Sequence, residues 1–128
     1  MARPEASARR RDLAERQGRR AEWLAALALA CKGWRPLGRR VRTPLGEIDL
    51  IVTRGKVLAA VEVKRRADVM AGVDAISPRS QRRIARALDW WLVRHPRFAA
   101  HDLRFDLVVV APRRWPHHLP NAFEPHAR

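Results

Sequence analysis

A predicted β-hairpin near the middle of the chain constrains the fold more than any other feature. Residues 47–53 (Glu-Ile-Asp-Leu-Ile-Val-Thr) and residues 56–64 (Lys-Val-Leu-Ala-Ala-Val-Glu-Val-Lys) are rich in the aliphatic and β-branched residues that favour strands. Arg54 and Gly55 between them predict a tight two-residue turn. The two strands are mostly apolar, so we expect other elements to pair with them and pack on them.

The chain around this hairpin alternates between helix and strand patterns. Residues 7–31 are rich in Ala, Arg, Leu and Glu, which are good helix formers, and residues 34–43 indicate an extended strand. Ser77 and Pro78 open a second helix, because serine is a favourable N-cap and proline a favourable first helical residue. Residues 103–110 (Leu-Arg-Phe-Asp-Leu-Val-Val-Val) predict a last core strand.

The order of these elements predicts one α/β domain with an αβββαβ core. Its sheet would be mixed and four-stranded, with helices packed on it. We assign residues 1–17 to the basic N-terminal part of the first helix, whose start is expected to fray. The domain itself would cover residues 18–112, and residues 113–128 would form a Pro-rich C-terminal tail.

The charge of the chain indicates a polyanionic partner. Its 128 residues include 27 Lys and Arg against 13 Asp and Glu, a formal net charge of +14. Such a field attracts nucleic acid, and an anionic membrane surface is the rival interpretation. Arginine outnumbers lysine and can bind phosphate oxygens bidentately, which favours nucleic acid. We expect nucleic-acid contacts from Arg16, Arg19, Arg42, Arg65, Arg79 and Arg82.

Cysteine usage and hydropathy favour a cytoplasmic protein. Cys31 is the single cysteine of the sequence, so it cannot form an internal disulfide. Arg19 and Arg20 precede an apolar run over residues 23–31, which superficially resembles an export signal. The run starts well inside the chain and is far shorter than the roughly 20 apolar residues of a membrane span. We therefore expect no membrane span.

Side-chain alternation brings acidic residues and a lysine to one face of the hairpin. On the first strand Asp49 and Ile51 would share a face, with Ile48 on the other. On the second strand Glu62 and Lys64 would share a face. With a turn at residues 54–55, Asp49 would lie opposite residue 60 and diagonal to Glu62, within roughly 5–8 Å.

A divalent cation would suit such a cluster. Neighbouring carboxylates repel and are costly to desolvate, and Lys64 would offset only part of that cost. Mg²⁺ prefers carboxylate oxygens and water, and it polarises phosphoryl oxygens and activates bound water. Lys64 could then orient the water or stabilise charge on phosphorus. A bare Glu-x-Lys also occurs on ordinary exposed hairpins. The preceding Asp49, the apolar strand and the basic chain together favour a site.

The hairpin also resembles a known nuclease signature. Residues 45–51 (Leu-Gly-Glu-Ile-Asp-Leu-Ile) and 61–64 (Val-Glu-Val-Lys) are similar to that of the PD-(D/E)xK superfamily. More narrowly, they resemble the YraN-type family of small bacterial predicted endonucleases, distant relatives of archaeal Holliday junction resolvases. The resemblance extends to residues 18–22, 77–81 and 104–108. Position 48 departs from the superfamily's proline, because it is isoleucine.

This resemblance implies a restriction-endonuclease-like fold and a set of site residues. Asp49 and Glu62 would bind Mg²⁺ or Mn²⁺, Lys64 would assist the attacking water, and Glu22 would be a supporting carboxylate. Gln81 is either a polar helper at the site or an ordinary first-turn helix residue.

The implied function is a metal-dependent endonuclease that cleaves DNA, for example branched or repair intermediates. The alternatives are a non-catalytic nucleic-acid-binding protein with the same fold, and a small basic protein associated with RNA or ribosomes. A pure binder has no need of an acidic cluster within a basic surface, which favours the enzyme. Resolvase-like enzymes act as dimers on two-fold junctions, so a homodimer is also a possible state of this protein.

Two features outside the hairpin have a structural interpretation. Asp106 on the last strand is either a neighbour of the site or a buried, hydrogen-bonded acid. His117 and His118 have no partners at metal-ligand spacing and lie in the predicted tail, so we expect them at the surface.

Overall fold

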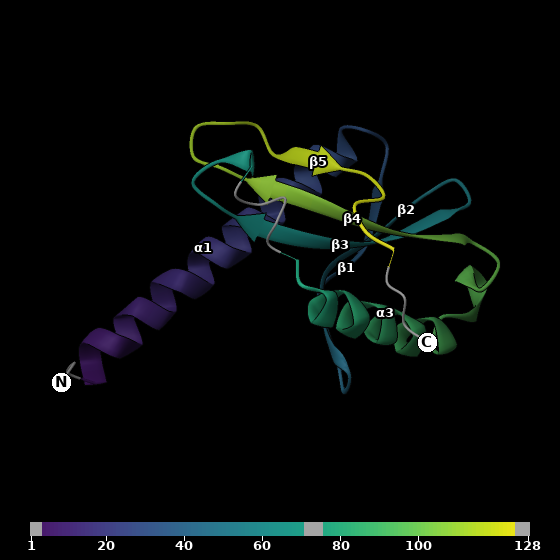
Figure 1. Ribbon diagram of the computed structural model, residues 1–128, viewed down its shortest axis with the longest axis horizontal. Helices are drawn as coiled ribbons and strands as arrows, with labels where there is room; N and C mark the ends of the chain where they lie inside the picture. Colours follow the sequence, from purple (N-terminus) through teal and green to yellow (C-terminus); the bar gives the residue numbers. More distant parts are fainter. Residues whose placement is uncertain (1–3, 71–75, 125–128) are drawn as a thin grey trace.

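The structure is a computed structural model that describes residues 4–70 and 76–124 (Figure 1). Residues 1–3, where fraying is predicted, and residues 125–128 at the end of the predicted tail lie outside the described residues. The elements are α1 (Pro4–Ala30), β1 (Arg35–Thr43), β2 (Gly46–Arg54), β3 (Val57–Arg65), α3 (Pro78–Val93), a 3-10 helix η1 (Pro96–Phe98), β4 (Asp102–Val110) and β5 (His117–Leu119).

The strands form one mixed sheet in the order β1-β2-β3-β4-β5. β1, β2 and β3 are antiparallel neighbours, β3 and β4 are parallel, and β5 is antiparallel to β4. The chain crosses from β3 to β4 through α3, which confirms the predicted αβββαβ order. The predicted count of four strands is wrong because residues 117–119, in the segment assigned to the tail, pair with the edge of β4.

Each face of the sheet is covered by one helix (Figure 1). On one face the helix α1 packs Ala21, Ala25 and Leu29 against apolar side chains of β2, β3 and β4. On the other face α3 packs its buried stripe, which includes Leu88 and Trp91, against a second apolar cluster. The two cores explain why the central strands β2, β3 and β4 carry apolar side chains on both faces.

The helix α1 is much longer than the part of it that packs. Its N-terminal half projects away from the body of the molecule (Figure 1), and residues 8–17 are all exposed. Burial begins with the alanine at position 21, where the sequence changes from charged to apolar. No helix among the described residues combines the length and the apolar character that crossing a membrane requires.

The start of α3 follows the predicted capping chemistry. The Ser77 hydroxyl accepts a hydrogen bond from the backbone N–H of Ser80 at 3.1 Å, and Pro78 is the first helical residue. This cap satisfies one of the backbone donors that every helix start leaves unpaired. It also fixes where the chain enters α3 after the segment 71–75, which lies outside the described residues.

Candidate active site

The hairpin register differs from the predicted one by two residues. Arg54 pairs with Val57, so the turn consists of Gly55 and Lys56, and Gly55 has a positive φ of 59°. Glycine adopts that conformation without steric cost, which explains why the turn starts there. Ala60 consequently pairs with the residue at position 51 and not with the one at position 49. A shift of two keeps the side chains of the paired residues 50–54 and 57–61 on their predicted faces.

The regular pairing of β2 with β3 ends just before the candidate site. Leu50 and Val61 form the last pair of the ladder, and Asp49 and Glu62 are the next residues outward on each strand. There the Asp49 carboxylate accepts a hydrogen bond from the backbone N–H of Val63 at 2.8 Å. The side chain thus supplies an acceptor where the backbone ladder stops, and it holds Asp49 against β3.

Strict side-chain alternation fails at the same point. Ile48 was expected to face away from Ile51, but both belong to the buried cluster beside α3. Leu50 lies in the cluster on the opposite face, beside α1. The expected face of Ile48 is therefore wrong. The irregularity coincides with the end of the β2–β3 ladder, where the backbone no longer has to keep its regular pleat.

The electrostatics of Asp49 are the clearest sign of a site. The pKa of Asp49 is raised from 3.8 to about 7. Burial is the largest cause of this rise, and the negative charge of Glu62 is the second. The Val63 hydrogen bond and the charge of Lys64 act in the opposite direction, while Glu22 adds to the rise. Carboxylates with such strongly perturbed pKa values gather at functional sites.

Glu62 and Lys64 form an ion pair at this site. Lys64 Nζ lies 3.0 Å from Glu62 Oε1, and the two side chains are only 24% and 16% exposed, respectively. They are two residues apart on β3 and share a face, as predicted. The positive charge of Lys64 also acts on Asp49, whose pKa it lowers slightly against the larger effects of burial and Glu62.

Glu22 has an arginine partner that the sequence interpretation missed. Arg40 Nε lies 2.9 Å from Oε1 and 3.0 Å from Oε2 of Glu22, and Glu22 is buried. Arg40 adopts a positive φ of 50°, which is uncommon outside glycine. A Cβ at Gly18 would lie 3.1 Å from Arg40 Nη2, so the glycine leaves room for the guanidinium. Neither feature has a sequence signal that separates Arg40 from the neighbouring Arg39.

The structure thus brings together four of the five predicted catalytic residues. Asp49 senses the charges of Glu62, Lys64 and Glu22. Gln81 is half-buried at the start of α3, where its amide Nε2 donates to the Ile76 carbonyl at 3.3 Å. Among the described residues, no hydrogen bond joins Gln81 to the carboxylates.

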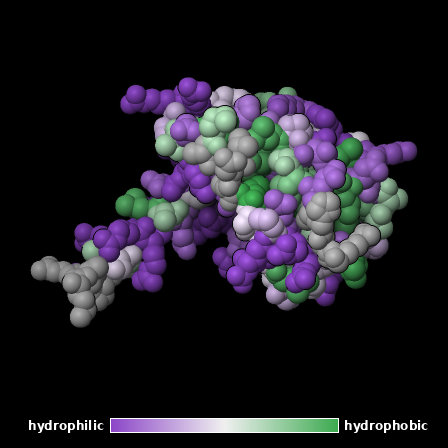
Figure 2. All heavy atoms as spheres, viewed as in Figure 1, coloured by the Kyte–Doolittle hydropathy of each residue, from purple (hydrophilic) through white to green (hydrophobic). Residues whose placement is uncertain are grey.

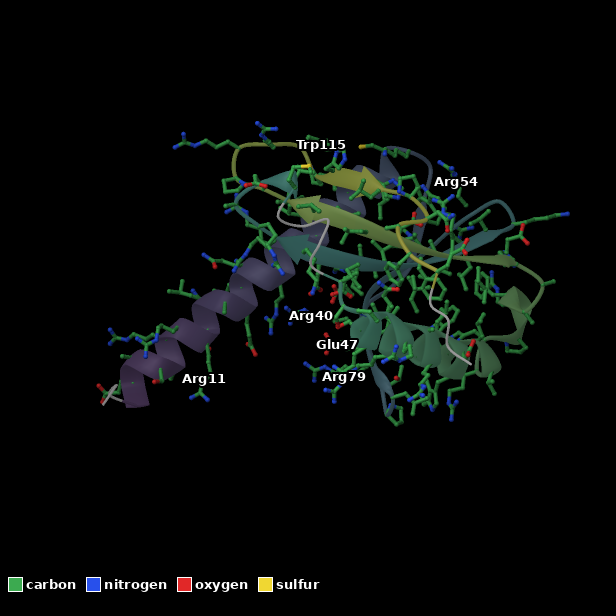
Figure 3. All side chains as sticks on the ribbon, in the orientation of Figure 1. Arg11, Arg40, Glu47, Arg54, Arg79 and Trp115 are labelled. Atoms are coloured by element: carbon green, nitrogen blue, oxygen red, sulfur yellow. The ribbon has the colours of Figure 1, made fainter. Side chains whose placement is uncertain are left out.

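The predicted nucleic-acid-binding arginines are all exposed and lie on several elements. Arg19 lies 3.8 Å from Glu15 and Arg42 lies 3.8 Å from Glu47, in ion pairs that water screens. Arg65 donates to the side-chain oxygen of Gln17. Figure 3 shows Arg40, Glu47 and Arg79 in the same part of the view, between α1 and α3.

The donor set at the cluster is a pair of carboxylates and not a cage. Within residues 4–70 and 76–124, no group of three or more His, Cys, Asp or Glu side chains is arranged to hold a metal ion. Glu22 is engaged by Arg40, which leaves Asp49 and Glu62. One or two carboxylates, with water and substrate phosphates, are a usual ligand set for Mg²⁺. The oxygen donors and the unfavourable charge on Asp49 therefore fit such an ion.

Comparison with known proteins places this chain in a family. The model of the uncharacterised protein family UPF0102 matches residues 21–110. The chain belongs to the UPF0102 family. It is 54% identical to a UPF0102 protein of Parvibaculum lavamentivorans over 112 residues, which are 88% of this chain and 84% of that protein. It is 55% identical to a UPF0102 protein of Methylorubrum extorquens over 115 residues, 90% of each chain.

The UPF0102 match contains the whole candidate site. Glu22, Asp49, Glu62, Lys64 and Gln81 all lie between residues 21 and 110. A third relative, the UPF0102 protein of Chelativorans sp., is 53% identical over 113 residues, 88% of this chain and 91% of that protein. The likeness therefore extends over nearly the full length of the relatives.

Asp106 proves to be a buried, hydrogen-bonded acid. It accepts from Arg104 Nε at 2.9 Å and Nη2 at 2.8 Å, and from the backbone N–H of Asn121 at 2.9 Å. His118 Nε2 donates to it at 2.7 Å, and the His118 side chain is only 5% exposed. The expectation that His118 is a surface residue is wrong, because β5 brings the ring over the acid.

These contacts determine the ionisation of Asp106. Burial alone would raise the pKa of Asp106, but the hydrogen bonds from His118, Arg104 and the Asn121 backbone outweigh it and lower the pKa to about 2. Asp106 is therefore an anion at neutral pH, and it ties β4 to β5 and to residue 121. It is structural and does not belong to the Asp49 cluster.

Proposed function

We propose that this protein is a divalent-metal-dependent endonuclease that hydrolyses phosphodiester bonds in DNA, as the resemblance to YraN-type nucleases implies. The observation that carries the proposal is the half-buried pair Asp49 and Glu62 with Lys64 on Glu62, and the pKa of Asp49 raised to about 7. A carboxylate whose charged form is disfavoured by burial and by a neighbouring acid destabilises the fold when no ligand is bound. A functional role therefore explains Asp49 better than a stabilising one does.

Asp49 and Glu62 would hold the cation, with Mg²⁺ or Mn²⁺ as the expected ions. When bound, such an ion polarises a phosphoryl oxygen and lowers the pKa of a coordinated water. The Val63 N–H positions the Asp49 carboxylate, because it binds one oxygen and leaves the other for a ligand. Ligand carboxylates are commonly oriented by hydrogen bonds of this kind.

Lys64 would act on the reacting phosphate. In the free protein its ammonium group is paired with Glu62 at 3.0 Å. With Glu62 serving as a metal ligand, the Lys64 ammonium would be available to stabilise the negative charge that develops on the phosphate. A preorganised cation in a partly buried site stabilises such charge better than one in water. Glu22, held by Arg40, would support the arrangement from α1.

The basic surface supports nucleic acid as the substrate. A net charge of +14 on 128 residues gives strong attraction to a phosphate backbone. Exposed arginines such as Arg16, Arg79 and Arg82 are free to contact phosphates over a wide area. We propose DNA as the substrate, and branched or repair intermediates in particular. The described elements offer no base-reading helix aligned with the site, which favours selection by DNA structure over selection by base sequence.

A non-catalytic nucleic-acid-binding protein is the second candidate. The observation that favours it is that the protein already neutralises two of the three acids, Glu22 with Arg40 and Glu62 with Lys64. A fold that had lost its metal would be stabilised by such internal pairs. The same basic surface would then serve binding alone.

Cleavage assays on purified protein separate the two candidates. Duplex, forked and four-way-junction DNA would be incubated with Mg²⁺ or Mn²⁺, using wild type, Asp49→Asn and Lys64→Ala. Glu47→Gln is the matched control, because Glu47 is an exposed acid on the same strand and pairs with Arg42. We expect cleavage by wild type and control, and a loss of roughly 100-fold or more in the two site variants. Tight binding without cleavage on every substrate would support the second candidate.

A further inference from the structure

An arginine-lined cavity lies beside α1, and none of the residues that line it belongs to the Asp49 cluster. It is bounded by α1, by the chain that leaves β3 and by the chain that leaves β4, and its volume is about 750 Å³. Five arginines line it, and none of the residues that line it is acidic: Arg20, Arg65, Arg66, Arg113 and Arg114. Figure 2 shows a strongly hydrophilic surface around the place where α1 leaves the body.

The arginines surround an apolar floor. Ala21 and Leu24 of α1 and Ala111 and Pro112 after β4 contribute the apolar part of the lining. A cavity that combines a few charged groups with apolar walls suits a ligand with both characters. A nucleotide is such a ligand, because a base offers an apolar face and the phosphate offers oxygens for guanidinium groups.

Most of the positive charge in the cavity lacks a partner. Among the described residues, Arg20, Arg113 and Arg114 make no side-chain hydrogen bond or ion pair. Arg65 donates to the side chain of Gln17, which is a neutral partner. Like charges gathered in one cavity repel one another, so a polyanion that binds there would relieve the repulsion.

The cavity adjoins the candidate active site without overlapping it. Ala21 lines the cavity, whereas its neighbour Glu22 pairs with Arg40. Lys64 pairs with Glu62, whereas the next residue, Arg65, lines the cavity. On α1 and on β3, one of two consecutive residues thus belongs to the cavity and the other to the candidate active site. A nucleic-acid strand that occupied both would pass the end of β3.

We propose that this cavity binds an unpaired strand of nucleic acid, with its phosphates on the arginines. The proposal rests on the proposed function in that the strand would be the continuation of the substrate. The cavity opens to solvent, and its volume of about 750 Å³ corresponds to a cube roughly 9 Å on a side, which is narrower than a duplex whose major groove alone is ≈12 Å wide. A duplex therefore cannot enter, but a flexible single strand can.

Trp115 gives the strand a platform for stacking. It follows Arg114 directly in the chain and is 60% exposed. Figure 3 shows Trp115 near β5, well apart in the view from Arg40 and Glu47. Proteins that bind single strands combine a basic groove with exposed aromatic side chains on which bases stack.

The test is the affinity of the full chain for a fluorescent oligothymidylate, measured by anisotropy at several salt concentrations without divalent metal. The variant is Arg113→Ala with Arg114→Ala, and the control is Arg86→Ala with Arg94→Ala, two exposed arginines at α3 on the opposite face. We expect the cavity variant to bind roughly tenfold more weakly, with a salt slope smaller by about 1.4 for two lost phosphate contacts. The control should match wild type.

A second variant tests the cavity without removing an arginine. Gln17→Glu has nearly the same shape and places an anion beside Arg65, so it should also weaken binding of the oligothymidylate. If both cavity variants bind the strand as tightly as the control does, the proposal is wrong.

Free thymidine monophosphate and inorganic phosphate distinguish a strand from a small ligand. We expect both to compete weakly with the oligothymidylate, because a strand engages several arginines at once. Thymidine monophosphate that binds as tightly as the oligothymidylate, with the same loss in the cavity variant, would overturn the assignment to a strand.

The outcome is separable from that of the proposed function. Loss of single-strand binding in the cavity variant, together with a wild type that cleaves nothing, would keep the cavity and reject the nuclease. Metal-dependent cleavage by wild type, together with unchanged binding in the cavity variants, would keep the nuclease and reject the cavity.

Discussion

The Asp49 carboxylate accepts a hydrogen bond from the backbone N–H of Val63 at 2.8 Å, at the point where β2 separates from β3. This contact places an acid of raised pKa next to Glu62 and Lys64. It also makes Asp49 a residue with two roles, because it closes the end of the strand ladder and forms part of the candidate site. Substitutions can separate these roles.

Asp49→Asn should keep the fold and lose the charge. The amide oxygen of asparagine can still accept from Val63, and the repulsion with Glu62 disappears, so the thermal midpoint in metal-free buffer should stay equal or rise. Asp49→Ala removes the acceptor, leaves the Val63 N–H unpaired and should cost about 1–2 kcal/mol. Denaturant unfolding of both variants checks this. A large loss of stability in Asp49→Asn would contradict the assigned roles.

Divalent metal should stabilise the wild type against heat. An ion that binds only the folded state adds about 2.7 kcal/mol at a concentration 100 times its dissociation constant. We expect Mn²⁺ to raise the thermal midpoint of wild type and of Glu47→Gln, and to leave Asp49→Asn and Glu62→Gln unchanged. Calorimetric scans with and without Mn²⁺ measure this. Equal shifts in all four proteins would mean that the ion binds elsewhere.

Arg40→Ala should destabilise the protein through Glu22. Removal of the guanidinium leaves a buried carboxylate without its partner, and because the pair is partly exposed we expect a cost of about 2 kcal/mol. Adding Glu22→Gln to Arg40→Ala should recover part of that stability. A double-mutant cycle by denaturant unfolding gives the coupling energy, and additive effects of the two changes would show that the pair is not coupled.

Asp106 should make the protein sensitive to acid. Its folded pKa of about 2 lies below the ordinary value of 3.8, so the unfolded state takes up the proton first as the pH falls. This contribution to stability is fully present above about pH 4 and is lost between about pH 4 and pH 2. Asp106→Asn should be less stable at neutral pH and should show a weaker dependence over that window.

The control for this prediction is Asp12→Asn, which changes an exposed acid on α1. It should unfold in acid as wild type does. His118→Ala removes one of the hydrogen bonds that lower the pKa of Asp106, so it should move the acid transition to higher pH. An unchanged transition in both Asp106→Asn and His118→Ala would refute the role given to the cluster.

The sequence alone predicted the element order and the shared face of Glu62 and Lys64, because both depend on local patterns. Apolar and β-branched runs define β2, β3 and β4, the Ser77-Pro78 cap defines the start of α3, and even spacing puts Glu62 and Lys64 on one face. A register error of two residues left this prediction intact, because the period of a strand is also two.

Tertiary structure alone decided the rest, because it depends on contacts between residues far apart in the chain. Arg40 pairs with Glu22 while its backbone has a positive φ, and Gly18 on α1 leaves room for its guanidinium group. Nothing near Arg40 in the sequence indicates this contact. β5 has only three residues, and it exists because the edge of β4 and the anion of Asp106 bind it. The arginine cavity likewise gathers three separate segments, each of which in the sequence is only one more basic stretch.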